Sequence, residues 1–159
     1  MNFQKIVKEN LCNYKHHKLQ IKKPGIYNYR GDELKYDHIL PKDLKHLNVI
    51  KHYRSDFFNS DLSKISYHKY FHHLNSSQAL CVNLFFPLIV SDETRIISEL
   101  LELPTKSIKS PCFEFVSDIE LTKQYSRKTN FDFFCKLSDK LKMVLRETLW
   151  VNIGGCTFE

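Results

Sequence analysis

The spacing of apolar residues near the start of the chain predicts a helix and then a β-hairpin. Residues 2–19 carry apolar side chains at helical intervals, which is typical of an amphipathic helix. The stripe expected to face inward consists of Phe3, Ile6, Val7 and Leu11. Residues 25–29 and 33–39 are predicted to be two strands, because Gly31 in the short connection allows the positive φ that tight hairpin turns require.

The middle of the chain is predicted to be helical. Short helices are expected after Pro41 and over residues 51–60. Residues 73–87 predict the strongest helix, and its run over residues 79–86 is apolar on nearly every side. This helix should therefore lie in a core and should end or kink at Pro87. Its candidate N-caps are Asn75, Ser76 and Ser77. Residues 91–103 predict another helix. Its expected inward side chains are Ile96, Ile97, Leu100 and Leu101.

Strands are predicted toward the end of the chain. Residues 111–116 and 128–134 are rich in Phe, and residues 142–150 are expected to return as a third strand. Helices followed by a short, incomplete β-sheet make an α+β fold. The length allows a single domain over residues 1–159, with a helical and hairpin portion at 1–72 and a core portion over the remainder.

Charge is divided unevenly along this domain. Through residue 75 there are fourteen Lys and Arg against seven Asp and Glu, so the first half carries a net charge of +7. The basic residues that we expect to contact nucleic acid are Lys15, Lys18, Lys22 and Lys23. Such a cluster attracts phosphate backbones by releasing counterions. The alternative is a solvated basic face that keeps the protein soluble.

Other features of the composition limit the class of protein. The five cysteines are scattered and odd in number, which indicates reduced thiols and a cytoplasmic protein. The longest apolar run, residues 84–90, is too short to cross a bilayer, so no membrane is expected as a partner. All eight histidines precede residue 75, without carboxylates or cysteines at the spacing of a zinc site.

Asp132 lies in the middle of an aromatic strand. Side chains alternate along a strand, so Phe131 and Phe133 share one face and Asp132 shares the other with Lys136. An ionised carboxylate in apolar surroundings costs free energy unless it meets a cation, a metal ion or hydrogen-bond donors. Asp132 is therefore a candidate metal ligand. The alternatives are an ion pair with Lys136 or Lys128, or an exposed edge strand.

Three segments resemble a known protein family. They are YDHILPKDLKHLN (residues 36–48), HHLNSSQALCVNLFFPLI (72–89) and RKTNFDFF (127–134). Their order and spacing are similar to those of a family of bacterial restriction endonucleases, which resembles a branch of the PD-(D/E)XK nuclease superfamily. The resemblance spans residues 25–137 and implies a restriction-endonuclease-like core and a Mg²⁺-dependent DNA endonuclease. A homodimer is compatible with that class.

The resemblance also implies roles for single residues. Phosphodiester hydrolysis uses a divalent cation, which hard carboxylate oxygens hold. The implied metal ligands are Asp132, Glu147 and Glu114, and the implied catalytic set is Asp132, Glu147, Gln78 and Lys136. The alternative role of Gln78 is to tie its helix to the sheet by hydrogen bonds. Leu149 stands where the catalytic lysine is expected, so Lys136 is the substitute considered.

Two other functions remain open from the sequence. Asp37 and His38, with Asn48 ten residues on, are similar to the start of an HNH nuclease motif, in which a strand-borne His is the general base. The Gly pair of that motif is absent. A non-catalytic nucleic-acid-binding or interaction protein is the other alternative. Residues 143–159 resemble the family poorly, and we expect either a truncated copy or a naturally short variant.

Overall fold

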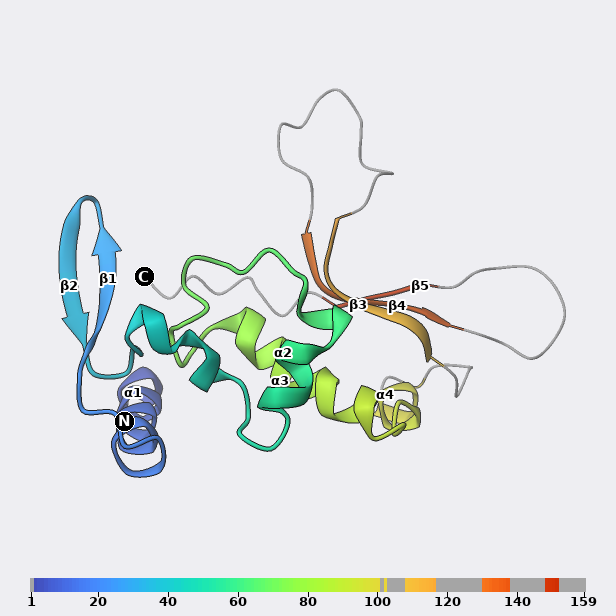
Figure 1. The fold of residues 1–159 in the computed structure, drawn as a ribbon, viewed down its shortest axis with the longest axis horizontal. Helices are drawn as coiled ribbons and strands as arrows, with labels where there is room; N and C mark the ends of the chain where they lie inside the picture. The colour runs from blue at the N-terminus through green and yellow to red at the C-terminus, as the bar shows by residue number, and fades with distance from the viewer. Residues whose placement is uncertain (1, 101, 103–107, 117–129, 138–147, 152–159) are drawn as a thin grey trace, which may run out of the picture. The chain divides into compact units, whose positions relative to one another are not determined.

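The computed structural model describes residues 2–100, 102, 108–116, 130–137 and 148–151 (Figure 1). Helices and antiparallel strands are both present, which confirms the predicted α+β class. The chain divides into two compact units. Unit 1 comprises Met1–Asp56 and Tyr67–Leu80, and unit 2 comprises Phe57–Ser66 and Cys81–Glu159. The single domain with its division at residue 72 stays a prediction.

Unit 1 begins with helix α1, Phe3–Asn13, which continues into the π-helical segment η1, Tyr14–Lys18. The helix predicted over residues 2–19 is therefore confirmed. Its N-cap is Asn2, whose side-chain oxygen accepts a 3.0 Å hydrogen bond from the backbone N–H of Gln4. The inward position predicted for Phe3 is wrong, because this side chain is 73% exposed and the half-buried stripe starts one turn later, at Ile6.

The predicted hairpin is confirmed in unit 1. Its strands are β1, Gly25–Tyr29, and β2, Asp32–Tyr36. The turn residues Arg30 and Gly31 have φ values of 50° and 98°, as a two-residue turn between twisted strands requires. The second strand is shorter than predicted because the chain turns after Tyr36, and Ile39 instead forms an isolated bridge with His73.

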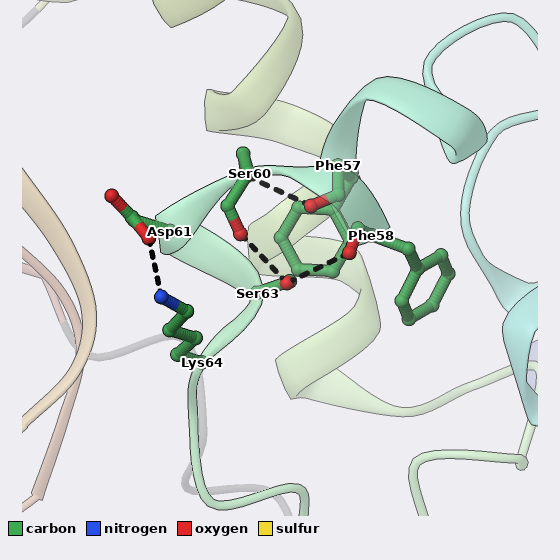
Figure 2. Close-up of polar contacts among 6 residues, drawn as sticks. All are labelled: Phe57, Phe58, Ser60, Asp61, Ser63 and Lys64. Atoms are coloured by element: carbon green, nitrogen blue, oxygen red, sulfur yellow. Dashed lines mark hydrogen bonds and ion pairs between the residues drawn. The ribbon is translucent and has the colours of Figure 1, made fainter.

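Short helices connect the hairpin to the rest of the chain. They are the 3₁₀ helix η2, Lys42–Asn48, the α-helix α2, Arg54–Asn59, and the 3₁₀ helix η3, Asp61–Ser63. In unit 1, the Asn48 amide donates to the carbonyls of Phe71 and His73 at 2.8 and 2.6 Å. In unit 2, serine hydroxyls donate to backbone carbonyls and Lys64 pairs with Asp61 at 2.6 Å, which closes the turn after α2 (Figure 2).

Helix α3, Ser77–Val90, is the longest helix in the described part of the chain. The Ser76 hydroxyl accepts from the N–H of Ala79 at 3.3 Å, so a predicted cap is confirmed. Pro87 lies inside the helix and does not end it. Helix α4, Arg95–Leu100, follows. Leu100 is 76% exposed, so its predicted inward position is wrong, because Ile97 and Ser98 form the buried side of this short helix.

Unit 2 contains a three-stranded antiparallel sheet in the order β3-β4-β5. The strands are β3, Ile108–Val116, β4, Asn130–Leu137, and β5, Thr148–Val151. Phe85 of α3 stacks on Phe133 of β4 with ring centroids 4.1 Å apart, and Phe113 of β3 lies 5.5 Å from Phe133. These rings are buried, so the apolar helix packs on the face of the sheet that carries them.

Candidate functional site

The register of the antiparallel ladder implies that Glu114 of β3 falls opposite Asp132 of β4. The registered pairs on either side are Phe113–Phe133 and Phe115–Phe131. Directly opposed residues in such a ladder have Cα atoms about 5 Å apart. Asp132 lies on a strand, as expected, and both acidic residues are half-buried. Two segments that are far apart in the sequence therefore bring two carboxylate residues to one point of the sheet.

Glu114 holds an unusual backbone conformation. Its φ of 54° lies in the left-handed region, where a residue with a Cβ is strained by about 1–2 kcal/mol. Ser110, earlier on β3, also has a positive φ of 50°, next to a register shift between Lys109 and Cys112. Bulged and strained strand positions are found near functional sites, where they redirect a side chain. The strained backbone at Glu114 is therefore an independent indication of a functional position.

Cys81 of α3 contacts the same point of the sheet. Its thiol donates a 3.4 Å hydrogen bond to the main-chain carbonyl of Asp132. Burial raises the pKa of the Cys81 thiol well above its usual value, and the negative charges of Asp132 and Glu114 raise it further. The thiol is thus within electrostatic range of both carboxylates. Cys81 is not among the residues predicted from the sequence to form the site, although its place in the middle of an apolar helix was a usable signal.

The surroundings of Asp132 are aromatic. Phe133 and Phe134, its neighbours on β4, are buried, and Phe115 stacks on Phe134 with ring centroids 4.1 Å apart. Carboxylate oxygens in such a setting are hard ligands that suit a divalent cation such as Mg²⁺. Among the residues that the structure describes, no group of three or more His, Cys, Asp or Glu could hold a metal ion. The candidate set here is a pair of carboxylates.

The other predicted catalytic residues of unit 2 lie farther from this pair or outside the described residues. Lys136 is exposed, and in the strand register it lies opposite Lys109 of β3 and Thr148 of β5. It lies four residues from Asp132, which is about 13 Å along an extended strand. Glu147, the third predicted metal ligand, lies outside the described residues. Within β5, the pair nearest to Asp132 is Val151 with Phe133.

Gln78 belongs to unit 1 and has a structural contact there. Its side-chain oxygen accepts a 2.9 Å hydrogen bond from the backbone N–H of His68, and the side chain is buried. This contact ties the start of α3 to the preceding loop. The observed contact is of the kind given by the predicted alternative, a hydrogen bond that anchors the helix, and its partner is the backbone of this loop.

The basic cluster of unit 1 is only partly at the surface. Lys18, Lys22 and Lys23 are exposed, as a phosphate-binding surface requires. Lys15 is 0% exposed, and its ammonium donates a 2.9 Å hydrogen bond to the main-chain carbonyl of Asp37. This buried position gives Lys15 a structural contact, whereas the predicted contact with nucleic acid requires an exposed ammonium. Burial lowers the pKa of Lys15, and the nearby Asp37 carboxylate partly offsets that effect.

Asp37 and His38 do not have the placement of an HNH nuclease. Both lie in the turn after β2 and not on a strand. Burial lowers the pKa of His38, and the positive charges of Lys8 and Lys15 lower it further. Asn48, the third residue of that alternative, donates to two backbone carbonyls. These contacts give the three residues structural explanations within unit 1.

A known protein family matches most of this chain. No curated protein and no solved structure matches it. Where the structure describes the chain, none of its helices combines the length and the apolar character needed to cross a bilayer. Residues 8–149 match a family described as restriction endonuclease associating with ARP, which supports a nuclease-related role for the chain. Because this match includes both carboxylates and most of the sequence, the chain belongs to this restriction endonuclease family.

Proposed function

We propose that the chain is a Mg²⁺-dependent DNA endonuclease of restriction type, with Asp132 and Glu114 as its metal-side carboxylates. The observation that carries the proposal is the opposition of these residues across β3 and β4. Mg²⁺ in proteins is commonly held by one or two carboxylates, with water and substrate phosphate oxygens completing its shell. Two opposed carboxylates suit that requirement. Glu114 resembles an acidic residue that the family carries shortly before the central aspartate, which adds support. The PD-(D/E)XK resemblance implies a further carboxylate on the strand after Asp132, where Glu147 is the candidate.

Bound Mg²⁺ would offset charge on the scissile phosphate and lower the pKa of the attacking water. The residues of the chain position that site: Cys81 holds the main chain at Asp132, and the Phe85 ring holds the next residue of β4. Glu147 stays the candidate third carboxylate and Lys136 the candidate ammonium. Phe134 lies between Lys136 and Asp132 on the strand, so we expect slower cleavage than with an adjacent lysine.

Plasmid cleavage tests this function. Supercoiled DNA is incubated with Mg²⁺ and the wild type, Asp132→Asn, Glu114→Gln or the control Asp56→Asn, which alters an exposed carboxylate of α2. The wild type and control should nick or linearise the plasmid, and EDTA should stop them. Asp132→Asn should lose more than the roughly 100-fold that removal of an outer metal partner causes. Equal cleavage by the wild type and Asp132→Asn overturns the proposal.

A second function is favoured by charge. Unit 1 carries thirteen Lys and Arg against six Asp and Glu, a net of +7, and Leu149 occupies the position of the expected lysine. These observations support a non-catalytic DNA-binding protein. Salt-sensitive binding to plasmid DNA, without cleavage in Mg²⁺, would favour this function over the first.

Light scattering on the same protein preparations, before DNA is added, tests the homodimer, which we propose as the form that cuts both strands.

A further inference from the structure

The β1–β2 hairpin is anchored at one end and open at the other. At the anchored end Gly25 is buried, and a Cβ atom there would meet the Ile39 side chain and the Leu40 backbone. A ring nitrogen of His72 also lies 3.3 Å from the carbonyl oxygen of Ile26. Every residue from 28 to 36 is exposed, and in Figure 1 the turn between the strands points away from α1. The hairpin is therefore a held ribbon with a free tip.

The two faces of this ribbon differ. On one face, Tyr27 packs against Tyr70 and His73, with ring centroids 5.2 and 5.7 Å apart. The other face carries two cross-strand pairs, Ile26–Lys35 and Asn28–Glu33. All four of these residues are exposed. A two-stranded hairpin is only marginally stable by itself, so the aromatic contacts on the first face explain how the second can stay open.

Arg30 lies at the free tip. Its guanidinium carbon is 5.2 Å from the centroid of the Tyr29 ring, a cation–π distance. Stacking of this kind orients the planar fork of N–H donors, which can bind two acceptors at once. The left-handed conformation of Arg30, with φ of 50°, places this residue in the turn itself. The tip thus presents a partly ordered cation.

We infer that the open face and tip of this ribbon enter the major groove of double-stranded DNA and contact base edges. The groove is about 12 Å wide and admits a two-stranded ribbon, whose strands lie about 4.8 Å apart. The exposed residue types suit base edges: Arg or Lys binds guanine, Asn binds adenine and Glu accepts from cytosine. The inference rests on the proposed function and names the element that reads its target.

Charge complementarity supports DNA as the occupant. Unit 1 has a net charge of +7, and Lys22 and Lys23 are exposed immediately before β1. Because these lysines directly precede the ribbon in the chain, they can contact the phosphates beside the groove that the ribbon enters. Phosphate contacts position a protein on the duplex, whereas base contacts select the sequence. Substituting the lysines should therefore weaken binding to all sequences, whereas substituting the ribbon residues should change which sequence is preferred.

The test selects bound sequences from a pool of short DNA duplexes with a randomised centre, in EDTA so that no cleavage occurs. The full chain is compared with Arg30→Ala, Asn28→Ala and the control Lys5→Ala, an exposed lysine of α1 in the same unit. The wild type should enrich a motif. Arg30→Ala should bind that motif about tenfold more weakly and lose a guanine preference, and Asn28→Ala should lose an adenine preference. Lys5→Ala should keep the motif.

Three results would overturn the inference. They are a wild type that enriches no motif, a motif and affinity unchanged in Arg30→Ala and Asn28→Ala, and tighter binding to a single strand than to the duplex. Circular dichroism checks that each variant is folded. The selection is done without Mg²⁺, so its outcome does not depend on cleavage or on Asp132. A protein that enriches a motif but does not cleave would support this inference and contradict the proposed function, so the two can fail separately.

Discussion

The thiol of Cys81 on α3 hydrogen-bonds the main-chain carbonyl of Asp132 on β4 at 3.4 Å. The contact uses the backbone of Asp132 and not its carboxylate, so it can position the strand without consuming an oxygen that would hold a cation. The next residue, Phe133, stacks on Phe85 of the same helix. Helix α3 therefore determines where along the sheet the acidic residue lies.

We predict that Cys81 is chemically inert in the folded protein. Burial and the charges of Asp132 and Glu114 raise its pKa, so the reactive thiolate is scarce at neutral pH. Native protein treated with iodoacetamide should carry little label on Cys81, and unfolded protein should label fully. Peptide mass spectrometry measures both, with half-buried Cys12 as the internal reference. Native labelling of Cys81 as fast as that of Cys12 would contradict the arrangement.

Glu114→Gly should relax the backbone while removing the carboxylate. Gly adopts positive φ without the Cβ clash. The free energy of unfolding of the Glu114→Gly variant should therefore exceed that of the Glu114→Gln variant by about 1 kcal/mol. Both variants should lose Mg²⁺-dependent cleavage to the same extent. Urea titrations give the stabilities. If Glu114→Gly is the less stable of the two, the strain at this position does not exist.

Gln78→Met tests whether Gln78 is structural. The substitution keeps the length of the side chain but leaves the N–H of His68 without its acceptor, which should cost about 1 kcal/mol of unfolding free energy. The rate of Mg²⁺-dependent cleavage per folded molecule should not change. A large fall in that rate, with stability preserved, would instead return Gln78 to the catalytic set.

Stability should depend on the protonation of His73. Burial, together with the smaller effect of the charges of His72, His38 and His68, lowers its pKa to about 4. An unfolded histidine has a pKa of about 6.5, so the unfolded state binds more protons between these values. The contribution of His73 is present above about pH 6.5 and is lost as the pH falls toward about 4.

His73→Phe isolates that effect. It keeps a ring against Tyr27 and Tyr70 but cannot be protonated. The urea midpoint of the wild type should fall more steeply than that of His73→Phe as the pH drops from about 6.5 to about 5, a range above most carboxylate titration. Parallel curves for the two proteins would show that His73 does not bind a proton differently in the folded state.

Lys15 should matter for folding and not for DNA. Lys15→Met removes the hydrogen bond to Asp37 inside unit 1, so DNA affinity and its salt dependence should not change in the folded variant. Replacing Lys18, Lys22 and Lys23 together with Gln should weaken binding and reduce the salt slope by about 3. Fluorescence anisotropy across a salt series measures both. A reduced slope in Lys15→Met would contradict its buried position.

The local elements of this fold follow from short-range pattern. The periodicity of residues 2–19, Gly31 between two strands and the aromatic strand around Asp132 each depend on neighbours within a few positions. Helix α1, the β1–β2 hairpin and β4 therefore appear where they were expected. Helix and strand ends were less accurate, as at Tyr36 and Pro87, since tertiary contacts decide where an element stops.

By itself, the sequence determined the fold class, the family segments and the strand that carries Asp132. Only the tertiary structure decided that Glu114 is the residue opposite it, that Cys81 lies beside both, and that Lys15 is buried. The physical reason is range. Strand register and burial depend on contacts between residues far apart in the chain, so periodicity can predict a strand or a basic cluster but not which side chains meet.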